Sequence, residues 1–133
     1  SNISIKYTGS LRTIATHQLS GTTLTTDAPP DNSGEGTSFS PTDLAATALG
    51  TCMMTIMAIA AKTHGISMKG AKSTVEKIMA SDPRRIGELI IDISLPCSLD
   101  SKERKILERA AHSCPVGRSL SLDVKETVNI NYI

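Results

Sequence analysis

Two cysteines in contrasting surroundings are the residues of this chain most able to do chemistry. Cys52 lies inside an uncharged stretch at residues 44–61, whereas Cys114 begins a turn at residues 114–117 that follows a helical pattern. Two thiols that are far apart in sequence, but carried on elements able to pack together, suit two-step redox chemistry: one sulfur attacks and the other closes a disulfide. The pair therefore indicates a redox function.

A cysteine reacts as its thiolate, so a cation, a hydrogen-bond donor or a helix N-terminus must favour that form. Cys52 lies about three turns into its expected helix, too far from the N-terminus for the helix dipole to help much. Arg12 is the best candidate for the cation, because alternation along its strand places it on the same face as Ile14. The alternative is an exposed edge-strand arginine that only keeps the sheet soluble.

Other residues that attract attention have simpler interpretations. Cys97 lies in a short connection without a sequence partner and is most simply a loop thiol. His112 lacks the paired ligands that a zinc site requires, so we expect no metal. Three methionines close to Cys52 either shape an adaptable apolar pocket or fill the core: Met53, Met54 and Met57.

The patterns that must position these residues predict one domain over residues 1–133. Ile3, Ile5 and Tyr7 alternate with polar residues, which is typical of a strand, and turn residues follow at 9–10 and 20–21. The expected order is an N-terminal three-stranded meander at 3–27, a loop at 28–39 that could form an active-site rim, a cysteine helix at 40–64, strands and a second helix at 69–114, and a C-terminal turn and strand at 115–133.

Local signals define both helices. Ser40 is a suitable cap for the first helix, and Asp43 complements the positive end of its dipole. In the second helix, Leu107, Ala111 and Cys114 fall at i, i+4 and i+7, so we expect Cys114 on its buried stripe. Three strands, a helix, two strands, a helix and a final strand indicate an α+β layered domain rather than a doubly wound parallel sheet.

Composition argues against several classes of partner. Among 133 residues there are 14 basic and 13 acidic side chains, without a long run of either sign, and only three aromatic residues. This leaves no electrostatic footprint or stacking surface for nucleic acid. The stretch at 44–61 is rich in Ala and Thr, which favours a buried helix over a membrane span. Three cysteines without paired spacing fit a reducing cytoplasm.

The chain resembles the OsmC/Ohr family of osmotically inducible and organic hydroperoxide resistance proteins. The resemblance rests on Phe-Ser-Pro-Thr-Asp-Leu at 39–44 followed by Cys52, and on Ala-Ala-His-Ser-Cys-Pro-Val at 110–116. It implies antiparallel sheets packed around long central helices in an intertwined homodimer, with a role in the stress response. It also implies that Cys52 is the peroxidatic and Cys114 the resolving cysteine, that an external dithiol such as a dihydrolipoyl group on a protein is the reductant, and that no metal, haem or flavin is used.

One position departs from the family pattern. The resemblance gives Arg12 the role of pairing with the thiolate, and the family places a glutamate that orients this arginine ten positions before the peroxidatic cysteine, where this chain has Thr42. Threonine cannot supply the bidentate charge-assisted bond of a carboxylate. Asp43 or Glu35 is expected to substitute. The expected substrate pocket consists of Met53, Thr42 and Phe39.

Two functions stay open at this point. The first is a thiol-dependent peroxidase that reduces organic hydroperoxides to alcohols through a sulfenic acid and an intramolecular disulfide, with activity weakened by the loss of the glutamate at Thr42. The second is a non-catalytic dimer that binds a small apolar ligand or senses oxidants. The retained cysteine pair favours the enzyme.

Overall fold

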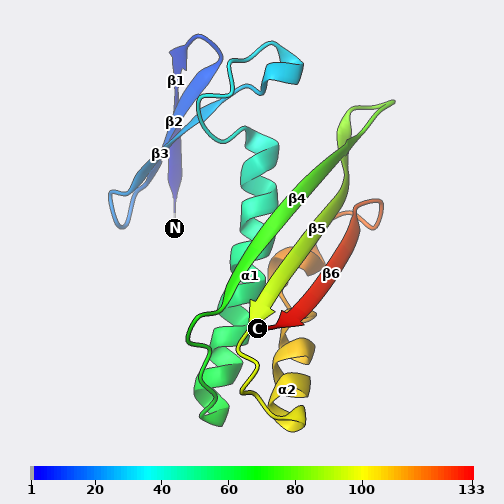
Figure 1. Cartoon of the computed structure of the whole chain (residues 1–133). Coiled ribbons are helices and arrows are strands. Elements are labelled where there is room, and N and C mark those ends of the chain that lie inside the picture. Colours follow the sequence, from blue (N-terminus) through cyan, green and yellow to red (C-terminus); the bar gives the residue numbers. More distant parts are fainter. Residues whose placement is uncertain (1) are drawn as a thin grey trace. The chain divides into compact units, whose positions relative to one another are not determined.

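The computed structural model describes residues 2–133, which form two compact units with a boundary between Ala45 and Ala46 in helix α1 (Pro41–His64). Strands β1, β2 and β3 belong to the first unit. Strands β4, β5 and β6 belong to the second unit together with helices α2 and α3 (Figure 1). The mixture of sheets and helices confirms the predicted α+β class. The single domain over residues 1–133 stays a prediction.

The first unit is built on the predicted three-stranded meander. Strands β1 (Ile3–Gly9), β2 (Arg12–His17) and β3 (Thr23–Asp27) pair antiparallel in that order, and a short 3-10 helix, η1 (Pro30–Asn32), follows (Figure 1). The pairing register places Arg12 opposite Asp27. The hairpin therefore brings a guanidinium and a carboxylate to the same face of the sheet.

One face of this sheet carries apolar side chains that face solvent. Ile3, Ile5 and Tyr7 alternate along β1 and are 63%, 71% and 64% exposed. Ala15 lies opposite Ile5 across the β1–β2 pair, and Leu24 lies opposite Ala15 across the β2–β3 pair. An apolar patch on a single chain is typical of an interaction surface.

Helix α1 starts where the sequence predicts. The Ser40 hydroxyl oxygen accepts a hydrogen bond from the Asp43 amide at 3.1 Å, and the Ser40 amide donates to the Asp43 carboxylate at 2.9 Å. This reciprocal pair satisfies two amide groups that the first helical turn would otherwise leave without partners. The helix ends at His64, and Gly65 adopts a φ of 66°, the left-handed conformation expected after a helix.

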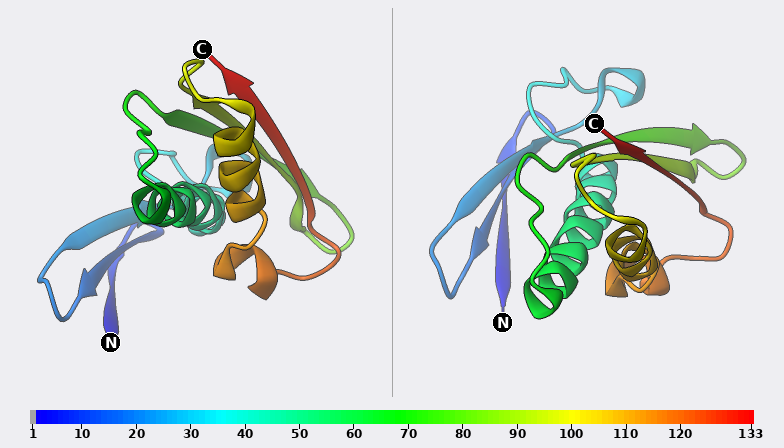
Figure 2. Two further views of the ribbon diagram at one scale, coloured as in Figure 1. Left: turned by 90° about the horizontal axis from the view of Figure 1, so that it is seen from below. Right: turned by 60° about the horizontal axis from the view of Figure 1, so that its bottom comes forward.

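The second unit packs two helices on one face of a three-stranded sheet. Its strands are β4 (Lys72–Ala80), β5 (Arg85–Leu95) and β6 (Lys125–Tyr132), and α1 and α2 (Ser101–Ala111) cover the same face (Figure 2). Strands β4 and β5 pair antiparallel, but β5 and β6 pair parallel. The second sheet is therefore mixed and differs from the expected antiparallel pairing only at β6, because the helical segment between β5 and β6 forms the crossover that a parallel pair needs.

The core of this unit lies between the helices and the sheet. Alternate residues of β5 point into it, and the opposite face of the sheet carries polar pairs such as Asn129 with Asp92. Gly50 allows α1 to approach β4 closely, since a methyl group there would lie 2.6 Å from a Val75 methyl carbon. The fully buried side chains of the core are Leu49, Met53, Met57, Leu89, Ile91, Ile93, Leu95 and Leu107.

Cys114 is buried, as expected, but not on the second helix. Helix α2 ends at Ala111, and Cys114 is instead the N-cap of a short helix, α3 (Pro115–Ser119). The reason is Pro115, which biases the residue before it toward an extended backbone; Cys114 has φ −69° and ψ 131°. The i, i+4, i+7 spacing of Leu107, Ala111 and Cys114 therefore extends beyond the last residue of α2, and only the first two of these residues lie on that helix.

Helix α1 also meets the length and composition expected of a membrane span, with a mean hydropathy of 1.8 over its most apolar window. Core helices of soluble proteins meet the same criterion. In the second unit, Leu49, Met53 and Met57 of this helix are buried against protein rather than exposed. This packing accounts for the apolar residues on that face of α1.

Candidate functional site

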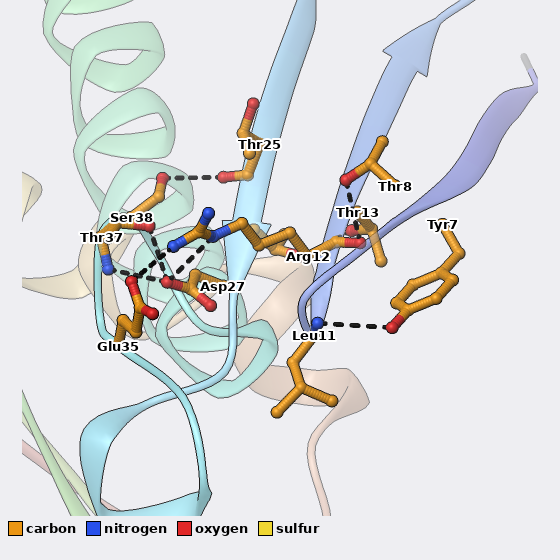
Figure 3. A network of polar contacts seen from close by, with 11 residues as sticks. Tyr7, Thr8, Leu11, Arg12, Thr13, Thr25, Asp27, Glu35, Thr37 and Ser38 are labelled. Atoms are coloured by element: carbon orange, nitrogen blue, oxygen red, sulfur yellow. Dashed lines mark hydrogen bonds and ion pairs between the residues drawn. The ribbon is translucent and has the colours of Figure 1, made fainter.

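Arg12 lies in a network of carboxylates and hydroxyls in the first unit (Figure 3). Its Nη2 donates to Glu35 Oε2 at 2.9 Å, and its Nε lies 3.4 Å from Asp27 Oδ2. The Asp27 side chain has no exposed surface, whereas that of Glu35 is 77% exposed. One carboxylate thus holds the arginine from inside the protein and the other from a surface loop.

Asp27 is kept ionised by its neighbours. Thr37 donates to Asp27 Oδ2 twice, from its hydroxyl at 2.6 Å and from its amide at 3.0 Å. These two hydrogen bonds, followed by the charge of Arg12, lower the pKa of Asp27 from its ordinary value of 3.8, although burial opposes them. Thr37 and Glu35 both come from the loop between β3 and α1. Glu35 binds Arg12 directly, and Thr37 binds Asp27, so two contacts hold this loop at the arginine network (Figure 3).

The other predicted residues of the first unit lie at the start of α1. One Asp43 oxygen accepts the Ser40 amide, and the Thr42 hydroxyl lies 3.2 Å from the Ser40 hydroxyl. Phe39 is 50% exposed and forms an isolated bridge with Thr26. Among the expected substitutes for the family glutamate, Glu35 contacts Arg12; the catalytic role of Asp43 and the pocket roles of Thr42 and Phe39 stay predictions.

The two predicted redox cysteines lie side by side in the second unit. Both are free thiols, with Cys52 half-buried on α1 and Cys114 buried at 2% exposure. Burial raises the pKa of the Cys114 thiol, as does its hydrogen bond with Cys52, while the Gly117 amide, which donates to Cys114 Sγ at 3.2 Å, acts in the opposite direction. In its resting state, Cys114 is therefore a protonated thiol held next to Cys52.

Met53 and Cys114 line a common cavity of about 150 Å³ in the second unit. His112 also lines it. Within residues 2–133, no three side chains of the His, Cys, Asp and Glu types gather in an arrangement that could hold a metal ion. Cys97 is exposed, and its amide and carbonyl groups bond to Ile133 and Arg104.

Sequence analysis missed two residues of the Arg12 network, Asp27 and Thr37. The sequence did not pair Asp27 with Arg12, because counting outward from the expected turn at residues 20–21 sets Arg12 opposite Pro29, whereas the observed register is centred one residue earlier. No sequence pattern pointed to Thr37, since it lies in an irregular loop whose path does not follow a periodic pattern. The Gly117 amide at Cys114 was missed as well, because α3 was expected to be a turn.

Comparison with known proteins supplies further findings. A family model described as OsmC-like protein matches residues 34–129. A crystal structure from Psychrobacter arcticus 273-4, provisionally described as an osmotic stress induced and detoxification response protein, is 44% identical with a TM-score of 0.92, and the match covers 98% of this chain and 95% of that chain. None of the curated proteins compared with the chain matches it.

Two more distant structures share the fold. An organic hydroperoxide resistance protein OsmC from Legionella pneumophila has 18% identity and a TM-score of 0.78, covering 98% of this chain and 97% of that chain. An OsmC-like protein from Mycoplasma pneumoniae has 16% identity and a TM-score of 0.83, covering 99% and 96%. At these identities the likeness concerns the fold alone.

Proposed function

Because this chain belongs to the OsmC-like protein family, we propose that it is a thiol-dependent peroxidase that reduces organic hydroperoxides to alcohols. The observation that carries the proposal is the contact between the free thiols of Cys52 and Cys114. The description of the Legionella pneumophila structure as an organic hydroperoxide resistance protein supports the substrate class.

The reaction follows from the two thiols. The Cys52 thiolate attacks the terminal peroxide oxygen, which breaks the O–O bond, releases the alcohol after protonation and leaves a sulfenic acid on Cys52. The Cys114 thiol then attacks the Cys52 sulfur and expels water, so that a disulfide forms. An external dithiol reduces this disulfide and becomes a cyclic disulfide itself. The contact between the thiols suits the second step, which needs the sulfurs adjacent.

Arg12 is the cation that we assign to the Cys52 thiolate, on the basis of the sequence resemblance. In the first unit, Asp27 and Glu35 both pair with the guanidinium of Arg12. These contacts support the proposal that carboxylates orient the arginine. We propose that these two carboxylates replace the family glutamate that is missing at Thr42. The buried Asp27 is the more effective of the two, because water screens the exposed Glu35.

The remaining assignments complete the proposal. The roles of Met53, Thr42 and Phe39 in binding the alkyl group of the peroxide stay predictions from the sequence. The proposed assembly is a homodimer, supported by the apolar face of the first sheet. A cytoplasmic location agrees with the need to return both thiols to the reduced state after each turnover. Neither a metal nor an organic cofactor enters the proposed chemistry.

The test is mass spectrometry of the intact protein after one equivalent of an alkyl hydroperoxide. The wild type is expected to lose two hydrogens and to yield a linked Cys52–Cys114 peptide. Cys52→Ser is expected to abolish turnover. Cys114→Ser is expected to keep the first attack, so that a sulfenic acid is trapped on Cys52, but to lose recycling.

Cys97→Ser is the matched control, because Cys97 is an exposed thiol in a loop. This substitution is expected to leave both steps unchanged. Thiols that stay unmodified by the peroxide would contradict the proposal. That result would favour a non-catalytic dimer that binds a small apolar ligand or senses oxidants.

A further inference from the structure

The cavity next to Cys114 contains charged groups that the peroxidase chemistry above does not use. Its wall is formed by α1, by the segment from α2 to α3 and by β6, and the residues that line it are Met53, Ala111, His112, Cys114, Gly117, Arg118 and Glu126. A carboxylate, a guanidinium and an imidazole therefore surround the approach to a thiol that is itself only 2% exposed. His112, Arg118 and Glu126 are exposed, so they form the side of the cavity that opens to solvent.

Glu126 occupies an unusual position in β6. Val124, Val128 and Ile130 occupy alternate positions on either side of it and pack against the core. The same alternation places Glu126 at the rim of the cavity, where it is exposed. A methyl group on Gly117 would lie only 2.9 Å from Glu126 Oε1. The Glu126 carboxylate is therefore close to Gly117, whose amide donates to Cys114 Sγ.

The cavity gives access to one sulfur of the pair. Of the residues that the structure describes, those that line it include Cys114 but not Cys52. A nucleophile in the cavity therefore meets the Cys114 sulfur, and Cys52 on its other side becomes the leaving group. The rate of thiol–disulfide exchange depends on which sulfur is accessible and on the fraction of the attacking thiol that is ionised. The cavity affects both.

We propose that this cavity receives the thiol that reduces the Cys52–Cys114 disulfide, and that Glu126 accepts the proton of that thiol. The proposal rests on the proposed function, which supplies the disulfide. The incoming thiol transfers its proton to Glu126, its sulfur bonds to Cys114, and the Cys114–Cys52 bond breaks to leave a Cys52 thiolate. The second thiol of the reductant then gives its proton to the Cys52 thiolate and attacks its own bound sulfur, which closes a cyclic disulfide and releases Cys114. Cys114 takes the proton back from Glu126.

The size of the cavity defines the class of thiol. A volume of about 150 Å³ corresponds to roughly five water molecules in the liquid. This volume holds a short unbranched chain that carries a thiol. The reductant is therefore a linear alkyl thiol or dithiol, free or as the end of an arm on a carrier.

The first test uses protein that has been oxidised to the Cys52–Cys114 disulfide and verified by intact mass. Failure to form this disulfide with peroxide contradicts the proposed function, independently of the steps measured next. The oxidised protein is mixed with 2-mercaptoethanol for a short time and quenched with acid, and the mixed disulfide is located by peptide mapping. We expect the adduct on Cys114; an adduct mainly on Cys52 would overturn the inference.

The second test compares Glu126→Gln with wild type in the reduction of the same disulfide. At about pH 6.5 the variant is expected to react roughly tenfold more slowly, because a positioned base is lost. The difference should close at a pH where the thiol is already ionised, a change that a purely structural role of Glu126 would not produce. His112 and Arg118 also line the cavity, so His112→Gln is measured in parallel to assign the pH dependence.

Glu76→Gln is the matched control, since Glu76 is an exposed carboxylate on β4 that does not line the cavity. Its reduction rate is expected to equal that of wild type. At matched thiolate concentration, the ratio of the reduction rates by 2-mercaptoethanol and by the branched 2-methylpropane-2-thiol is expected to be larger for wild-type protein than for an exposed small-molecule disulfide, and equal ratios would contradict a role of the cavity in selecting the thiol. Equal pH profiles for Glu126→Gln and wild type would refute the role of Glu126.

Discussion

Asp27 is a carboxylate without exposed surface, and its hydrogen bonds from Thr37 keep its pKa below the ordinary value of 3.8. A pKa that is lower in the folded than in the unfolded protein stabilises the fold above the unfolded value. That stabilisation is lost as the pH falls from about 3.8 toward the folded pKa. Asp27→Asn is therefore expected to lower the melting temperature near neutral pH and to show a smaller loss of stability on acidification than wild type.

Thermal unfolding followed by circular dichroism between about pH 6 and pH 2.5 measures this effect. Asp123→Asn is a suitable control, because Asp123 is exposed and it is the backbone amide of this residue that donates to the Ser121 hydroxyl. If Asp27→Asn unfolded with the same pH dependence as wild type, Asp27 would not be the ionised partner of Arg12. The same variant tests the peroxidase proposal, where loss of the buried partner is expected to slow the reaction of Cys52 with peroxide.

At the scale of elements, Gly50 controls how closely α1 packs on β4. A methyl group at this position would lie 2.6 Å from the Val75 methyl carbon Cγ2. Gly50→Ala gains about 1 kcal/mol of helix propensity, but overpacking costs about 1–3 kcal/mol. We therefore expect net destabilisation, and we expect Val75→Ala to relieve it. Urea unfolding of both single variants and the double variant should give a favourable coupling of about 1–2 kcal/mol; additive effects would contradict the close packing.

A second contact joins α2 to β6. The Tyr132 hydroxyl donates to Glu108, and the guanidinium of Arg104 lies 4.0 Å from the centre of the Tyr132 ring. Burial and Glu108 raise the pKa of Tyr132 to about 12. Since this pKa is raised from an unfolded value of 10.0, its contribution to stability is complete below 10.0 and is lost as the pH rises toward 12.

Tyr132→Phe is expected to lower the free energy of unfolding by about 1 kcal/mol, because the hydrogen bond to Glu108 is lost. Urea unfolding near neutral pH measures this loss. Absorbance titration of the phenols supplies a separate check, in which the wild type shows a tyrosine that ionises near pH 12 and Tyr132→Phe does not. Tyr7→Phe, an exposed position on β1, should keep the high-pH step.

Sequence patterns predicted most of these elements, because strand alternation, turn residues and the helix cap are local signals. They failed where non-local geometry decides. The parallel pairing of β6 depends on where the chain returns after α2, and the position of Cys114 depends on how Pro115 ends a helical pattern. Asp27 was missed because the β2–β3 turn is centred one residue before the turn expected at residues 20–21, and Thr37 depends on the path of an irregular loop.

At the scale of the whole molecule, the predicted chemistry divides between the two units. The first unit contains Arg12 with Asp27 and Glu35, and the second contains Cys52 and Cys114. Each group is organised within its own unit by short-range contacts. The thiol pair can therefore be tested for disulfide formation separately from the contribution of Arg12 to the rate of the first attack.

The apolar face of the first sheet leads to the last prediction, a homodimer in solution. Ile3, Ile5 and Tyr7 are all more than 60% exposed on one face of β1, and full burial of such side chains stabilises by about 1.5–3 kcal/mol each. A second copy that covers this face would supply that burial twice by symmetry. Light scattering after size-exclusion chromatography is expected to give twice the 14.1 kDa chain mass. Ile5→Lys is expected to shift the protein toward monomer, whereas Ser4→Lys, on the opposite face of the same strand, should not; a monomeric wild type would contradict this assembly.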